Sequence, residues 1–63
     1  MPIFTELNIV TARLYADALA ACFETTVIGL TDIRGCGTVY EYAFADGTSA
    51  AVWFECGRVY GEA

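Results

Sequence analysis

The stretch that decides the fold runs from residue 38 to residue 60 and reads TVYEYAFADGTSAAVWFECGRVY. The runs on either side of Asp46-Gly47 are rich in aromatic and β-branched residues, which favour strands. Asp-Gly between two such runs is the strongest local hairpin signal, and it favours a type I′ turn because both residues accept positive φ. The sequence therefore predicts a hairpin of strands 38–45 and 49–60, with a bend at Gly57.

The register of this hairpin follows from the turn. If Asp46 and Gly47 are the two turn residues, Tyr42 faces Ala51 and Tyr40 faces Trp53. Alternation then gives one face made of Val39, Glu41, Ala43, Ala50, Val52, Phe54 and Cys56, and another made of Tyr40, Tyr42, Phe44, Ala51, Trp53 and Glu55. The first face suits close packing under a helix and leaves the aromatic face partly open. The opposite assignment, with the aromatic residues under the helix, remains an alternative.

The segment before the hairpin predicts a helix over residues 9–23, with Asn8 or Thr11 as its N-cap. Apolar residues recur there at spacings of three and four and predict the stripe that packs on the sheet: Val10, Leu14, Ala18, Ala21 and Cys22, widened by Leu19 and Phe23. The many alanines also make the helix thin enough to lie close to a sheet.

The remaining segments complete an α+β fold in a single domain spanning residues 1–63. Residues 2–7 predict a short edge strand. Residues 27–33 predict a strand with a bulge at Gly29, followed by a turn at residues 35–37. The expected architecture is a single helix packed on a small three- to four-stranded antiparallel sheet, in the order β-α-β-β-β, around one core.

Three cysteines, Cys22, Cys36 and Cys56, match no zinc or redox spacing. We expect free thiols, with Cys22 and Cys56 as small core residues; one disulfide is the alternative. The sequence shows no signal peptide and no long apolar run, so a cytoplasmic location is expected.

The charge balance bears most directly on function. Eight carboxylates stand against three arginines, without lysine or histidine, giving a formal charge of −5. Such a chain repels nucleic acid and anionic lipid and is attracted to basic protein surfaces. The missing residue types also disfavour an enzyme, a metal site or a cofactor. The composition therefore indicates a binding protein with a basic protein partner.

Two sets of residues are candidates for partner binding. Carboxylates spread over a rigid β surface can take the positions of phosphates on a DNA-binding protein, and the candidates are Glu24, Asp32 and Glu55, then Asp17 and Glu6. Asp17 is weaker because Arg13 precedes it by four residues on the helix. An aromatic interface of Tyr40, Tyr42 and Trp53 is the second candidate. A solvated acidic surface and an ordinary aromatic core are the simpler alternatives.

The chain also resembles the small phage-encoded anti-CRISPR proteins, in particular the type I-C inhibitors among them. The resemblance lies in the acidic, lysine-free composition, the single helix over residues 8–23 after a short first strand, and the glycine-punctuated strands ending in Val52-Trp53-Phe54. It implies a DNA mimic that binds the Cascade surveillance complex in the host cytoplasm and blocks recruitment of target DNA. The alternative is a small homo-oligomeric structural or regulatory module that associates through the aromatic sheet face.

Overall fold

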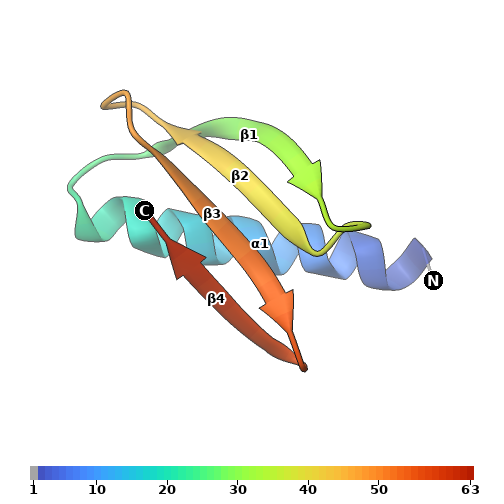
Figure 1. Cartoon of the computed structure of the whole chain (residues 1–63). Helices are drawn as coiled ribbons and strands as arrows, with labels where there is room; N and C mark the ends of the chain where they lie inside the picture. The colour runs from blue at the N-terminus through green and yellow to red at the C-terminus, as the bar shows by residue number, and fades with distance from the viewer. Residues whose placement is uncertain (1) are drawn as a thin grey trace.

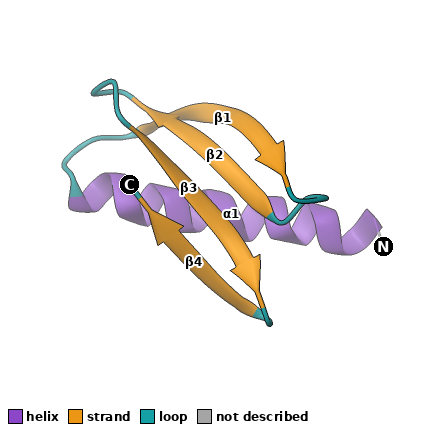
Figure 2. Cartoon of the chain, viewed as in Figure 1, coloured by secondary structure: helices purple, strands orange, loops and turns teal. Residues whose placement is uncertain are grey.

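The computed structural model describes residues 2–63, with side chains from residue 9 onward. These residues form helix α1 (Pro2–Cys22) and strands β1 (Val27–Arg34), β2 (Val39–Phe44), β3 (Ser49–Glu55) and β4 (Arg58–Glu62). The strands form an antiparallel sheet in the order β1-β2-β3-β4, and α1 crosses one face of it (Figures 1 and 2). The predicted α+β class, with a single helix on an antiparallel sheet, is confirmed.

The predicted order of elements is wrong at both ends. Residues 2–7 belong to α1 rather than to an edge strand, and Pro2 fits the first helical turn because an N–H there has no helical partner. The fourth strand comes instead from the predicted strand 49–60, which breaks at Cys56-Gly57. These residues have φ of 51° and 75° and connect Glu55 to its partner Arg58, as in a two-residue type I′ turn.

The loop between β2 and β3 has three residues rather than two. The Phe44 N–H donates to the Thr48 carbonyl over 2.8 Å, and the Gly47 N–H donates to the Phe44 carbonyl over 3.2 Å. Among the loop residues Gly47 alone has a positive φ, of 89°, which is the pattern of a type I turn closed by a glycine bulge. Tyr40 therefore faces Val52. This shift of one residue moves every β3 side chain to the face opposite the predicted one.

Helix α1 packs on the sheet through a line of alanines. The buried core consists of Ala12, Ala16 and Ala20 from α1 with Tyr40, Tyr42, Phe44, Ala50 and Val52 from the sheet. The aromatic residues of β2 thus lie under the helix, as the alternative assignment of the two faces predicts. The small residues of β3 also lie under the helix, as the first assignment predicts. Close approach is also evident at Gly61 of β4, where a Cβ atom would lie 2.5 Å from the Tyr15 ring.

The stripe predicted to pack on the sheet is wrong except at Leu19, which is half-buried and packs against the core. Phe23 is exposed just after the end of α1. The other members are exposed on the side of α1 that faces away from the sheet: Val10, Leu14, Ala18, Ala21 and Cys22. Bulky tyrosines already fill the space above β2, so the thin alanine side of the helix fits there and the leucine side does not.

The two buried tyrosines differ in their hydrogen bonding. The Tyr40 hydroxyl donates to the Gly37 carbonyl over 2.5 Å and so ties the β1–β2 loop to the core. The Tyr42 hydroxyl is buried and has no partner among the described residues. Burial raises the pKa of both side chains, so the folded protein favours their neutral forms.

Substituting these tyrosines should separate the two cases. Tyr40→Phe should lower the free energy of unfolding by about 1 kcal/mol, because it removes a hydrogen bond and leaves a carbonyl unpaired. Tyr42→Phe should leave the stability unchanged or raise it, because it removes a buried hydroxyl that has no partner. Urea unfolding of both variants measures the difference, and equal losses would contradict this assignment.

The close helix–sheet approach predicts the effect of enlarging an alanine. Ala16→Leu should destabilise the protein by about 1–3 kcal/mol, because the added atoms have no space above the tyrosines. Ala18→Leu adds the same atoms on the exposed side of α1 and should be nearly neutral. Urea unfolding at low protein concentration compares the two variants, and similar losses would argue against the observed helix orientation.

Asp46 stabilises the β2–β3 loop through Thr48. Its carboxylate accepts hydrogen bonds from the Thr48 hydroxyl over 2.5 Å and from the Thr48 N–H over 3.0 Å, and these bonds lower the pKa of Asp46. A carboxyl group with a lowered folded-state pKa stabilises the protein above its unfolded pKa, and this contribution is lost as the pH falls through the folded-state value.

Asp46→Asn should therefore flatten the acid side of the stability profile. The asparagine carbonyl can still accept from Thr48, but it does not titrate. The melting temperature should fall less in the variant than in the parent protein as the pH drops from about 5 to about 2.5, a range that spans the ordinary aspartate pKa of about 3.9. Parallel profiles for the two proteins would show that Asp46 has no such role.

Candidate functional site

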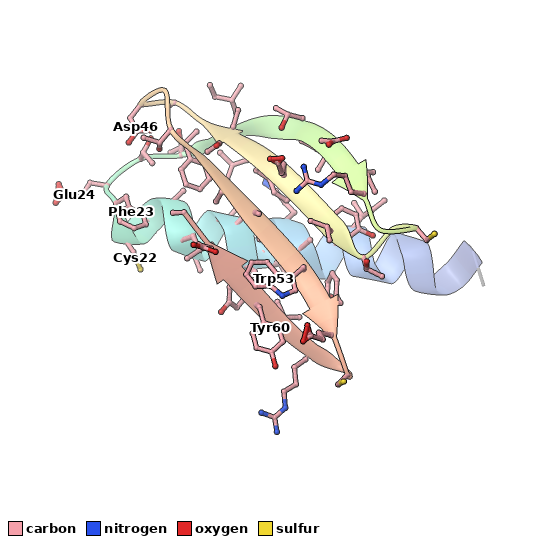
Figure 3. The ribbon with its side chains drawn as sticks, viewed as in Figure 1. Cys22, Phe23, Glu24, Asp46, Trp53 and Tyr60 are labelled. Atoms are coloured by element: carbon pink, nitrogen blue, oxygen red, sulfur yellow. The ribbon has the colours of Figure 1, made fainter. Side chains whose placement is uncertain are left out.

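The face of the sheet that turns away from α1, here called the open sheet face, is the candidate functional site. Its side chains follow from the strand register and form rows across the sheet. One row is Asp32, Glu41, Ala51 and Glu62; the next is Arg34, Val39, Trp53 and Tyr60; Glu55 and Arg58 follow at one end. Figure 3 looks onto this face, with Trp53 and Tyr60 in front of the ribbon and α1 behind it.

An aromatic pair lies within this face. Trp53 and Tyr60 are partners across β3 and β4, and their rings stack with centroids 5.8 Å apart and planes 17° apart. Trp53 is half-buried, and Tyr60 remains 38% exposed. Both residue types offer large apolar area with a polar atom at the edge, which suits a protein interface.

Charged side chains border the aromatic pair. Arg34 Nη1 lies 2.7 Å from Glu41 Oε2 and 3.3 Å from Asp32 Oδ2, and Glu41 is the main reason that the Arg34 pKa is raised. Among the described residues Glu55 and Glu62 form no ion pair. The four carboxylates and two arginines of the open sheet face leave a formal charge of −2, which favours a basic partner.

The structure brings some of the predicted partner-binding residues together and separates others. Asp32, Glu55 and Trp53 share the open sheet face. Tyr40 and Tyr42 are buried under α1, so their predicted part in an aromatic interface is wrong; the one-residue register shift separates them from Trp53. Tyr60 takes their place beside Trp53.

The predicted acidic residues of the helix do not join this face. Asp17 is exposed on α1, and its Oδ1 lies 3.0 Å from Arg13 Nε. The spacing of four residues predicts this ion pair. Glu6 lies in α1 and its side chain is outside the described residues.

Glu24 occupies a different end of the molecule. It has a φ of 58°, and its N–H donates to the Ala21 carbonyl while the Thr25 N–H donates to the Ala20 carbonyl. This is a Schellman helix end, where glycine is usual. The Cβ atom of Glu24 makes this conformation less favourable than it is for glycine, and the negative charge is unfavourable near a helix C-terminus. Glu24 lies at the same end as Asp46, away from Trp53 and Tyr60 (Figure 3).

Sequence reasoning missed Glu41 and Glu62 as members of the site, and it gave Tyr60 only as a residue adjoining the aromatic group. The predicted register placed Glu41 and Glu55 on opposite faces, whereas they share the open sheet face. Two turns decide these positions. The three-residue loop at residues 45–47 puts Glu41 on the same face as Trp53, and the turn at Cys56-Gly57 brings Tyr60 and Glu62 of β4 to that face.

Other features of the described residues offer less. A shallow hollow of about 260 Å³ is lined by Phe23, Asp46, Thr48 and Ala63, and the Asp46 carboxylate there is already bonded to Thr48. Across the described residues no cluster of potential metal ligands occurs, and no helix has the length and apolar character needed to cross a membrane.

All three cysteines are free and exposed. The expected free thiols are therefore present, but the prediction that Cys22 and Cys56 lie in the core is wrong. Cys22 lies on the outer side of α1, and Cys56 lies in the β3–β4 turn.

Comparison of the chain with protein-family models, with curated proteins and with solved structures finds no match. The open sheet face is therefore the feature from which a function can be inferred.

Proposed function

We propose that this chain is an acidic binding protein whose open sheet face covers a basic, DNA-binding surface of another protein. The observation that carries the proposal is the uncovered Trp53–Tyr60 stack beside the carboxylates of a four-stranded sheet. The resemblance to anti-CRISPR proteins suggests the partner, a type I CRISPR Cascade complex. Blocking recruitment of target DNA would then be the function.

The open sheet face has the composition of a protein-binding surface. Interfaces commonly place aromatic residues at the centre and polar or charged residues at the rim. Here Trp53 and Tyr60 supply the aromatic centre, and Glu41, Glu55 and Glu62 supply negative charge around it. The aromatic pair would contribute to residence time, while the exposed carboxylates would accelerate association with a basic surface.

Arg34 limits the negative charge of the free protein. It pairs with Asp32 and Glu41, so these two carboxylates are not fully available to a basic partner. On binding, lysine or arginine side chains of the partner would compete with Arg34 for the same oxygens. Removing Arg34 should therefore strengthen the attraction rather than weaken it.

A binding experiment on a purified type I Cascade complex tests the proposal. Glu55→Lys combined with Glu62→Lys should lower the association rate at least about tenfold at low salt, and the affinity of the parent protein should fall as salt rises from a low concentration to about 0.5 M. Trp53→Ala should accelerate dissociation, with a loss of about 2 kcal/mol or more if it is a central contact. Arg34→Gln should increase the association rate.

Glu24→Lys, with Glu55 and Glu62 intact, is the matched control, because it reverses one exposed carboxylate away from the open sheet face. It should weaken binding far less than Glu55→Lys alone or Glu62→Lys alone, each of which also reverses one carboxylate. DNA should compete with the protein for the complex. Simultaneous binding of DNA and protein, or salt-independent affinity, would rule out occupation of a DNA-binding surface.

A further inference from the structure

The outer side of α1 carries an apolar stripe that no described side chain covers. We define the outer stripe as Val10, Leu14, Ala18 and Ala21. Val10 is 58% exposed and Leu14 is 66% exposed, and both alanines are exposed as well. We infer that the outer stripe is a homodimer interface, on which the α1 helix of a second copy packs in antiparallel orientation.

The sizes of the side chains favour this orientation. The larger residues, Val10 and Leu14, precede the smaller ones, Ala18 and Ala21. A twofold axis near residue 16 brings Val10 of one copy against Ala21 of the other, and Leu14 against Ala18. Each large side chain then meets a small one, which allows close packing. A parallel pair would place Leu14 against Leu14 and leave a gap at the alanines.

The charges on the helix are complementary in the same orientation. Arg13 and Asp17 are the charged side chains among residues 9–22 of α1, and they lie on one flank of the outer stripe, 3.0 Å apart. In an antiparallel helix pair equivalent flanks face each other, so Arg13 of one copy lies close to Asp17 of the other. The twofold axis produces this contact twice.

The rest of the charge distribution bears on where two copies could meet. Each chain carries a formal charge of −5, so two copies repel each other least when they meet through a surface without unpaired carboxylates. The outer stripe is such a surface, and the carboxylates of the open sheet face lie on the far side of the molecule. The same negative charge disfavours adsorption of the stripe to anionic lipid.

The dimer would be modest in affinity. A standard interface covers about 800 Å² on each partner, which is close to a fifth of the 4239 Å² surface of this chain. A single helix face supplies less than that. A dissociation constant on the order of micromolar to tens of micromolar is therefore expected, and the measurement must reach higher concentrations.

Sedimentation equilibrium from about 5 to about 300 µM tests the inference, because this range spans the expected dissociation constant. The parent protein should change from its monomer mass of 6.8 kDa toward twice that mass. Leu14→Glu should remain monomeric throughout the range. Ile28→Glu is the matched control, since Ile28 is 69% exposed on β1, and it should still dimerise. Circular dichroism confirms that each variant is folded.

A charge exchange identifies the orientation of the helices. Arg13→Asp alone and Asp17→Arg alone should each weaken the dimer at least about fivefold, because each places like charges across the twofold axis. The double variant, with both changes, restores opposite charges and should recover dimerisation.

A parent protein that stays monomeric at the highest concentration would overturn the inference. So would a dimer that survives Leu14→Glu, or a double variant that does not recover. None of these results would affect the proposed partner binding, which uses the other side of the molecule.

Discussion

The structure depends on the close packing of the alanine side of α1 against the inner face of the sheet, where β2 presents tyrosines and β3 presents Ala50 and Val52. Ala12, Ala16 and Ala20 let the helix backbone approach the sheet, and Tyr40 and Tyr42 fill the space that remains. Gly61 continues the same constraint at β4, where a side chain would collide with Tyr15 and Leu19. Because this layer leaves little space between α1 and the sheet, it fixes which side of the helix faces inward. The outer stripe and the open sheet face are consequences of that choice.

The fold class could be predicted from the sequence because its signals are local. Alternating aromatic residues, the Asp-Gly pair and a helical period each depend on near neighbours. The side of α1 that faces the sheet could not be predicted, because both sides of the helix carry apolar residues. Helix α1 has alanines on one side and larger apolar residues on the other, so the apolar period alone favoured the wrong side. The shape of the tyrosine layer, a tertiary property, decided against it.

The hairpin register shows the same limit on a smaller scale. Both a two-residue loop and a three-residue loop can place Gly47 at positive φ, so the sequence Asp46-Gly47 is compatible with either. The structure selects the longer loop, in which Phe44 closes on Thr48. That single added residue puts Glu41 on the same face as Trp53 and separates Tyr40 and Tyr42 from it. The candidate site is therefore only partly predictable: the sequence predicts Asp32, Glu55 and Trp53 as binding residues, but their neighbours depend on the register.

The two exposed surfaces differ in ways that assign them different partners. The open sheet face has a net negative charge and an aromatic pair, so its best complement is a basic surface and not another copy of itself. The outer stripe is nearly neutral, and the order of its large and small side chains suits antiparallel packing against a second copy of the same stripe. The outer stripe lies on the side of α1 that faces away from the sheet. A dimer formed through this stripe would therefore leave both open sheet faces free. In such a dimer, binding of one open sheet face would raise the effective concentration of the other open sheet face near the partner. This effect requires that the partner presents two basic sites at a matching separation.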